Sequence, residues 1–207
     1  MKISDAQLER FVVYFTFFYT LVFSVNALVR GNVEFVYYTA LMILSISIIF
    51  FIHRKMHFYP IVLMSLSLLG LLHLLGGNVA IGDTRLYDVY FLPGAFRYDN
   101  FVHMFGSSIM VMLAYALLTP ILDDKFELSR GYFILLLVLV GMGLGAINEL
   151  VEFLAVLVFD VSQQVGDYTN TLLDLVFNTI GSIGMAVFLV FSRRHVTKQF
   201  FPENGGK

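Results

Sequence analysis

Six long apolar stretches constrain this chain more than any other feature. Each is close to the roughly 20 residues that a helix needs to cross a bilayer. Segments such as FVVYFTFFYTLVFSVNALV have no polar face, so a soluble bundle of amphipathic helices could not bury them. The sequence therefore predicts an all-α, polytopic transmembrane helix bundle. Its six predicted spans cover about residues 11–29, 35–52, 58–76, 101–119, 131–157 and 171–192.

The Lys and Arg residues predict how this bundle is oriented. Six spans place both termini on the same side of the membrane, and only three of the 13 cationic residues, Arg30, Arg85 and Arg97, fall on the other side. The positive-inside rule then predicts that both termini are cytoplasmic. We expect a single transmembrane domain over 11–192, between cytoplasmic segments 1–10 and 193–207. The residues on the terminus side are Lys2, Arg10, Arg54, Lys55, Lys125, Arg130, Arg193, Arg194, Lys198 and Lys207.

Two further features limit the fold and the chemistry. Lys2 and Arg10 precede an apolar stretch that is longer than a signal-peptide core, so we expect a retained first helix. The loop over 76–100 is rich in aromatic residues, which favours a partly ordered cap, with a re-entrant segment as one form of it, over disorder. The chain has no Cys, which excludes disulfides, thiolate metal sites and cysteine nucleophiles.

Ionisable residues gather at one depth once this topology is fixed. Asp99 and His103 begin the fourth span at its outer end and share a helix face at i, i+4. Glu149 lies about 28 Å along the fifth span, and Glu152 follows on the same face. Asp174 opens the sixth span on that side. The sequence therefore predicts an outward-facing cluster of Asp, Glu and His.

The cluster admits functional and structural interpretations. An unpaired carboxylate in hydrocarbon costs several kcal/mol, so such residues face the bundle interior and find partners. The alternatives are structural. Glu149 and Glu152 could lie at a hydrated helix end, and Asp174 could be present because an acid is favourable at the start of a helix. We take as catalytic candidates Glu149, Glu152 and His103; as metal-ligand candidates Asp99, His103, Glu149, Glu152, Asp167 and Asp174; and as supporting residues His73 and Asn178.

A local echo links the fourth and sixth spans. DNFVHMFGS, from Asp99, and DLVFNTIGS, from Asp174, both read D-x-x-x-[H/N]-x-x-G-S. The pattern places an acid and a second polar residue on one helix face, with small residues one turn later for close packing. Gly141, Gly145, Gly181 and Gly184 are predicted to serve such packing. There is no H-E-x-x-H motif, P-loop or G-x-S-x-G motif, and no basic patch for nucleic acid.

The stretches YDNFVHMFGS, GAINELVEF, QVGDYTNTLLDLVFNTIGS and HLLGGN resemble, in this order, the YjdF-like family of multi-pass inner-membrane proteins. The resemblance covers about residues 70–190. It implies the same helical membrane fold and a prokaryotic inner-membrane location, but no established activity. VanZ-like membrane proteins are more distantly similar, although this chain lacks the Arg that their pattern places near its second and third blocks.

Three functions fit these residues. The first is a membrane enzyme with a divalent metal ion as cofactor, acting on a lipid or envelope-linked substrate. The second is a proton- or cation-coupled transporter, for which six spans are few unless the chain forms a homo-oligomer. The third is a membrane scaffold whose polar network only fixes helix packing. The lipid bilayer is a partner in all three, and nucleic acid in none.

Overall fold

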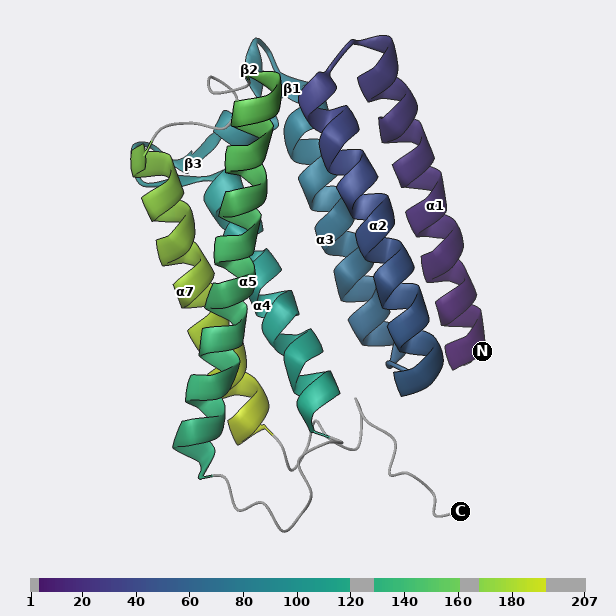
Figure 1. Ribbon diagram of the computed structural model, residues 1–207, viewed down its shortest axis with the longest axis vertical. Coiled ribbons are helices and arrows are strands. Elements are labelled where there is room, and N and C mark those ends of the chain that lie inside the picture. Colours follow the sequence, from purple (N-terminus) through teal and green to yellow (C-terminus); the bar gives the residue numbers. More distant parts are fainter. Residues whose placement is uncertain (1–3, 120–128, 161–167, 193–207) are drawn as a thin grey trace.

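The computed structural model describes residues 4–119, 129–160 and 168–192, and it confirms the all-α transmembrane bundle (Figure 1). Its six long helices are all long and apolar enough to cross a membrane. They run side by side along the long axis of the molecule. They are α1 (Asp5–Val29), α2 (Val33–Met56), α3 (Pro60–Asn78), α4 (Tyr98–Leu118), α5 (Arg130–Phe159) and α7 (Tyr168–Phe191).

Local capping sets the helix ends, and several helices extend beyond the predicted apolar spans. α1 begins at Asp5 rather than near residue 11, because Ser4 and Gln7 form a capping box in which each side chain accepts a hydrogen bond from the other's backbone N–H. Asn32 caps α2 by accepting from the Phe35 N–H. α5 continues to Phe159 and ends where Asp160 turns into the left-handed conformation.

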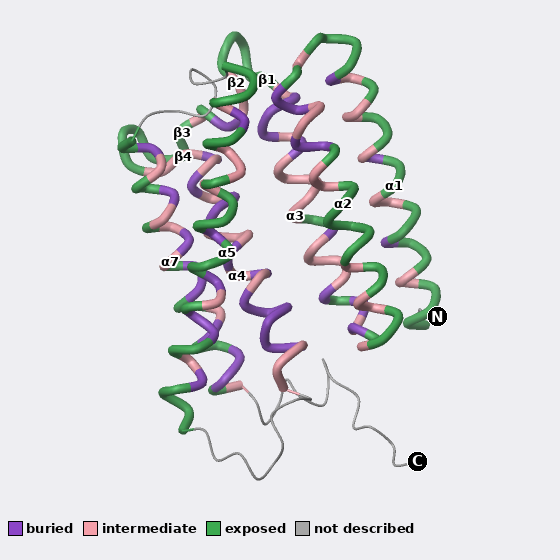
Figure 2. The backbone as a smooth tube through the Cα atoms, viewed as in Figure 1, coloured by how far each residue is buried: buried purple, intermediate pink, exposed green. Residues whose placement is uncertain are grey.

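Close packing of α4 against α5 and α7 forms one half of the bundle. α4 is the most buried of these helices, as the tube coloured by burial shows (Figure 2). A Cβ on Gly181 would strike the Met104 carbonyl oxygen of α4, and a Cβ on Gly145 would meet the Asn178 side chain at 2.7 Å. Gly141 is equally tight. The packing role predicted for Gly184 is wrong, because a Cβ there would meet open space.

The other half of the bundle consists of α1, α2 and α3. The Tyr19 hydroxyl donates to the Ser67 carbonyl oxygen at 2.8 Å, and the hydroxyls of Thr16 and Ser67 lie 2.6 Å apart. Near the other end of these helices, Asn26 donates to the side chain of Asn78. The outer faces of α1 and α2 are exposed and apolar, which is expected of helices that face lipid.

The segment between α3 and α4, for which the sequence predicted partial order, is ordered throughout and consists of two short antiparallel hairpins. β1 (Ala80–Ile81) pairs with β2 (Thr84–Arg85), and β3 (Tyr90–Leu92) pairs with β4 (Phe96–Arg97). A 3-10 helix, η1 (Leu86–Asp88), joins them. Both hairpins lie at the end of the bundle where α4 and α7 begin (Figure 1). The only helix described between α3 and α4 is the short η1, and a re-entrant segment stays a prediction.

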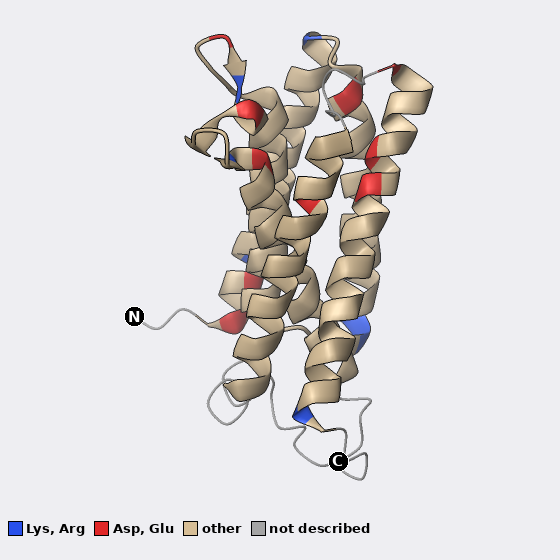
Figure 3. Cartoon of the chain, turned by 90° about the vertical axis from the view of Figure 1, so that its left-hand side faces the viewer, with Lys and Arg blue, Asp and Glu red and all other residues tan. Residues whose placement is uncertain are grey.

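The described basic residues separate between the two ends of the bundle (Figure 3). Arg10, Arg54, Lys55 and Arg130 belong to the end that holds the N-terminus, whereas Arg30, Arg85 and Arg97 belong to the end with the hairpins. The cytoplasmic assignment of the termini still depends on the positive-inside rule and stays a prediction.

Candidate functional site

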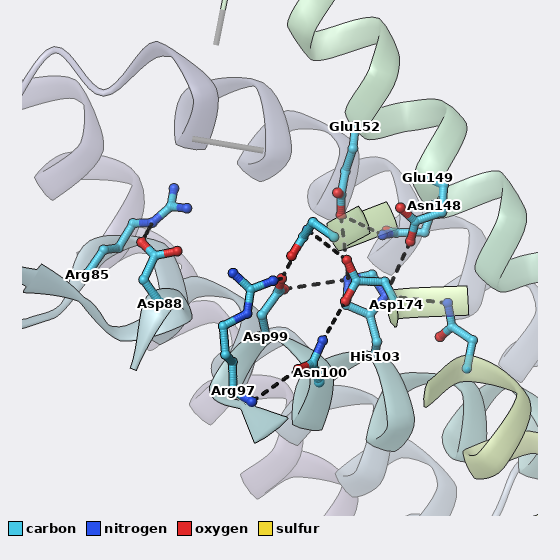
Figure 4. A network of polar contacts seen from close by, with 12 residues as sticks. Arg85, Asp88, Arg97, Asp99, Asn100, His103, Asn148, Glu149, Glu152 and Asp174 are labelled. Atoms are coloured by element: carbon cyan, nitrogen blue, oxygen red, sulfur yellow. Dashed lines mark hydrogen bonds and ion pairs between the residues drawn. The ribbon is translucent and has the colours of Figure 1, made fainter. Parts of the chain in front are cut away.

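A buried histidine on α4 lies among four carboxylates. His103 Nε2 is 3.6 Å from Asp99 Oδ1 and 3.9 Å from both Glu152 Oε1 and Asp174 Oδ2. On the other side of the ring, His103 Nδ1 is 3.4 Å from Glu149 Oε1. These five residues come from α4, α5 and α7 and point toward one another (Figure 4). We refer to them as the polar cluster.

Asp174 is the most deeply buried member of the polar cluster, and each of its carboxylate oxygens accepts a hydrogen bond. Its Oδ1 accepts from Asn100 Nδ2 at 2.9 Å, and its Oδ2 accepts from Asn170 Nδ2 at 2.8 Å. Asn100 in turn accepts from the backbone N–H of Arg97 at 3.0 Å, at the start of α4. These bonds fix the orientation of the Asp174 carboxylate, as expected of a group that must hold its position in a site.

The two glutamates approach the histidine from α5. Glu149 and Glu152 lie three residues apart on one face of this helix, and both side chains are partly exposed. Asn148 Nδ2 donates to Glu152 Oε1 at 2.8 Å. Glu149 Oε1 is buried and accepts no hydrogen bond from the described residues, although it faces His103. This buried oxygen therefore has an unused acceptor position among the described residues.

The sequence pattern shared by the fourth and sixth spans lies at a contact between α4 and α7. Asn178 Nδ2 on α7 lies 3.4 Å from His103 Nδ1 on α4, so the second polar positions of the two stretches meet. The small residues that follow let the backbones approach, and Ser108 Oγ donates to the Gly181 carbonyl oxygen at 3.1 Å. The repeated pattern therefore marks the place where α4 and α7 cross.

The charges of the polar cluster are not balanced by its neighbours. Arg97 is the only described cation in contact with it, with Nη2 3.6 Å from Asp99 Oδ2. Arg85 pairs with Glu34 at 3.3 Å and with Asp88 at 3.2 Å. Even with His103 protonated, four carboxylates face two positive charges among the described residues. Among the described residues this leaves an excess of negative charge, which a bound cation or additional protons can offset.

Two groups of these side chains are close enough together to be candidate metal ligands. His103 takes part in two groups of three whose ligand atoms lie within 4.8 Å of one another, one with Asp99 and Asp174 and the other with Glu149 and Glu152. The Nε2–oxygen distances of 3.6 and 3.9 Å exceed ordinary hydrogen bonds. They approach the separation of about 3.4 Å between two ligands of a tetrahedral zinc ion, given metal–ligand bonds of about 2.1 Å.

His73, predicted as a supporting residue, belongs to a neighbouring aromatic group rather than to the cluster itself. Its Nδ1 lies 2.5 Å from the hydroxyl of Tyr87 in η1. Gly76 and Gly77 make this possible, because a Cβ on either residue would overlap the ring of Tyr87 or of Phe35. Burial raises the pKa of Tyr87 well above its usual value of 10, and the charges of Asp99 and Glu152 raise it further. The Tyr87 hydroxyl therefore stays protonated, and the His73 tautomer decides which of the two groups donates.

The structure brings together most of the predicted site residues and adds others. Asp167 lies outside the described residues. Sequence reasoning missed the three amides that hold the carboxylates, and it missed Tyr87. Their signals were weak: Asn170 precedes Asp174 by one turn, Asn148 precedes Glu152 by one turn, and Asn100 adjoins Asp99.

Comparison with known proteins gives a family but no characterised relative. No curated protein and no solved structure matches the chain. The more distant likeness to VanZ-like proteins is not found. One family model matches residues 10–195, and its description is a predicted membrane protein of the DUF2238 type. Because this match covers most of the chain, the protein belongs to the DUF2238 family of predicted membrane proteins, the YjdF-like family that its motifs resemble.

Proposed function

We propose that the polar cluster binds a divalent metal ion and that the protein is a membrane enzyme acting on a lipid or envelope-linked substrate. The observation that supports this most strongly is the excess of carboxylates around His103 in an otherwise apolar bundle. Carboxylates with one imidazole suit Mn²⁺, Zn²⁺, Fe²⁺ or Mg²⁺.

Asp99, His103 and Asp174 are the residues proposed to hold the ion. They form one of the two compact groups, and the Asn100 and Asn170 amides already fix the Asp174 carboxylate. Such outer hydrogen bonds orient metal ligands and are as characteristic of metal sites as the ligands themselves. When bound, a divalent ion would lower the pKa of a coordinated water and polarise a phosphoryl or acyl oxygen.

Glu149 and Glu152 are then placed for acid–base chemistry. Glu149 has a carboxylate oxygen without a hydrogen-bond donor among the described residues, and both side chains are partly exposed. A general base needs a free lone pair within reach of its proton. Alternatively, His103 Nδ1–H can donate to Glu149, which would fix the tautomer that leaves Nε2 for the metal.

The location that fits this function is the outer half of the bilayer. The positive-inside rule predicts that the hairpin end of the bundle lies outside the cytoplasm. Asp99, His103 and Asp174 of the cluster lie in the first two turns of α4 and α7, which begin at that end (Figure 1). In a prokaryotic inner membrane, lipids and lipid-linked envelope precursors would reach such a site from the outer leaflet. A homo-oligomer is compatible with this proposal but is not required by it.

Transport has less support in the geometry. Beyond the cluster, residues 104–118 of α4, 131–148 of α5 and 175–191 of α7 contain no Asp, Glu, His, Lys or Arg. A proton or cation pathway normally continues through such residues toward the other side of the membrane. A purely structural network is the other alternative, and it predicts no metal.

Metal content is the test of this proposal. We would purify the protein in detergent, incubate it with Mn²⁺ or Zn²⁺, remove excess ion and measure bound metal by mass spectrometry. We expect about one ion per chain in the parent, and at least a tenfold weaker affinity in Asp174→Asn and His103→Gln. Asp88→Asn is the matched control, because Asp88 pairs with Arg85 outside the cluster, and it should bind as the parent does.

The two parts of the proposal have separate readouts. A parent that binds no metal, or binds it equally in Asp174→Asn, would exclude the metal site and favour proton-coupled transport or a structural network. If metal binds, the metal-loaded protein would be incubated with an inner-membrane lipid extract. Mass spectrometry should then show a lipid species consumed by the parent and left intact by Glu149→Gln. An unchanged extract would argue against the enzyme while leaving the metal site in place.

A further inference from the structure

The β3–β4 hairpin has a well-defined tip. The Ala95 N–H donates to the Leu92 carbonyl oxygen at 3.0 Å, which closes a four-residue turn. Pro93 occupies the second position of this turn, and Gly94 occupies the third with φ of +71°. This is the arrangement of a type II turn, in which Gly supplies the positive φ. The tip therefore projects its side chains in fixed directions.

This hairpin lies beside the transmembrane helices rather than beyond their ends. The rings of Phe96 and Phe177 have centroids 5.1 Å apart, and Phe91 packs edge-on against Phe101 of α4 at 6.2 Å. Phe177 is nine residues into α7, which corresponds to about 13 Å along the helix. Phe177 lies about one turn beyond Asp174 of the polar cluster, so the hairpin reaches the depth of the cluster beside α7.

The tip is apolar, and the described part of the chain does not cover it. Residues 90–95, YFLPGA, are all exposed and contain no charge. Tyr90, Phe91 and Leu92 are 50%, 51% and 61% exposed. Because successive strand residues point to opposite faces, this exposure leaves about half of each side chain uncovered on both faces of β3, beside the ring contact of Phe91 with Phe101. Neighbouring apolar residues on α7, Val176 and Ile180, are exposed in the same way and would face lipid.

The first hairpin provides a contrast within the same cap. Its turn contains Gly82 and the charged Asp83, and Thr84 follows. All three are exposed, which suits a tip in water. Ile81 is 60% exposed, so its accessibility matches that of Leu92, but it adjoins this polar turn instead of an apolar one.

We propose that the β3–β4 hairpin sits in the membrane interface beside the polar cluster, with Tyr90, Phe91 and Leu92 against the boundary between phospholipid headgroups and acyl chains. A two-stranded hairpin leaves backbone groups unpaired along its outer edges, and the interface can hydrate them whereas the hydrocarbon core cannot. Aromatic side chains are enriched at this level of the bilayer. The β1–β2 hairpin stays in water.

Arg97 connects this interfacial hairpin to the polar cluster. It pairs across the sheet with Tyr90, its guanidinium lies 5.9 Å from the centre of the Tyr90 ring, and it reaches Asp99 at 3.6 Å. Arginine at the interface extends toward headgroup phosphates while its stem contacts apolar groups. The bilayer would therefore help to position the only described cation in contact with the cluster.

Single tryptophan probes test this proposal, because the chain contains no Trp and any indole fluorescence comes from the introduced residue. Leu92→Trp and Ile81→Trp would each be reconstituted into phosphatidylcholine and phosphatidylglycerol vesicles with or without brominated acyl chains. We expect brominated lipid to quench Leu92→Trp at least about twofold more than Ile81→Trp, with a blue-shifted emission. Iodide on both sides of the membrane should quench Ile81→Trp more.

Three outcomes would overturn the proposal. Equal quenching of the two probes by brominated lipid would remove the distinction between the hairpins, and iodide quenching of Leu92→Trp would place its tip in water. Resistance of Leu92→Trp to both quenchers would mean that protein, such as a second copy of this chain, covers it. Tyr90→Trp provides a second probe if Leu92→Trp does not fold. The result does not depend on metal binding, so this proposal and the proposed function can fail separately.

Discussion

The two halves of the bundle solve the same packing problem with different chemistry. α1, α2 and α3 join through neutral hydrogen bonds, such as those of Tyr19 and Thr16 with Ser67, and through aromatic rings. α4, α5 and α7 join through glycines at close range and through the ionisable polar cluster. Neutral groups would suffice to hold helices together in a membrane. The charged half therefore contains more than assembly requires, which is why the proposed function is assigned to it.

The segment between α3 and α4 makes different contacts with the two halves. Tyr87 of η1 packs against His73 and Phe35 of the first half, whereas Phe96 of the second hairpin packs against Phe177 of α7. The loop between α3 and α4 thus clamps both halves at the same end of the molecule. Changes in the second half should affect metal binding as well as stability, whereas changes in the first half should affect stability alone.

The largest effect is expected where α7 meets the backbone of α4. In Gly181→Ala the added methyl would strike the Met104 carbonyl oxygen, and this backbone atom cannot rotate away. We expect a loss of about 3 kcal/mol in the free energy of unfolding, or failure to fold, as for severe overpacking. Unfolding in mixtures of SDS and a mild detergent would measure it. The control is Gly184→Ala, which meets open space and should be neutral or stabilising by up to about 1 kcal/mol.

The second prediction concerns the buried carboxylate of α7. Asp174→Ala leaves the amides of Asn100 and Asn170 without this acceptor, while it relieves repulsion within the cluster. We expect the free energy of unfolding of the metal-free protein to fall by about 2 kcal/mol. This is less than the combined contribution of two buried hydrogen bonds to a charged group. Asp88→Ala removes one side of an exposed ion pair and should change the free energy of unfolding, measured in the same SDS experiment, by under about 0.5 kcal/mol. Stabilisation by Asp174→Ala would show that the cluster is a strained site with no role in packing.

Much of the fold could be predicted because its signals are local. A span needs only about 20 consecutive apolar residues, so composition alone located all six helices. Their ends were less predictable, since polar caps such as Ser4 extend a helix past its apolar run. The hairpins depended on turn residues, and the Pro93–Gly94 pair is a turn signal that the aromatic content of the loop obscured.

The candidate site was predictable only where depth determined it. Asp99, His103, Glu149 and Glu152 could be placed at one level by counting along apolar spans. Which atoms meet depends on helix rotation and crossing, which no single segment specifies. That is why Asn100, 74 residues from its partner Asp174, was missed. The contact of Tyr87 with His73 was hidden as well, because it depends on the space left by two glycines.

The third prediction asks whether His73 supports the polar cluster. Tyr87→Phe removes the hydroxyl that lies 2.5 Å from His73 Nδ1 and keeps the ring between Gly76 and Phe35. We expect the free energy of unfolding to fall by about 1 kcal/mol, the usual contribution of one hydrogen bond, and metal binding to stay unchanged. Bound metal would be measured beside the unfolding midpoint. A drop in metal affinity without a change in the midpoint would instead make the pair part of the site, and the separation of the halves would be wrong.

The smallest effect is expected inside the first half. Tyr19→Phe removes the hydroxyl that donates to the Ser67 carbonyl oxygen at 2.8 Å, at the contact between α1 and α3. Hydrogen bonds between transmembrane helices contribute about 0.6 kcal/mol on average, because partners are also available in the unfolded state within the membrane. We therefore expect the free energy of unfolding, measured in SDS, to fall by about 0.6 kcal/mol. Tyr14→Phe, whose side chain is exposed on the same helix, should produce none. A loss above about 2 kcal/mol would mean that the first half also depends on polar contacts for its assembly, and the contrast with α4, α5 and α7 would then be one of charge alone.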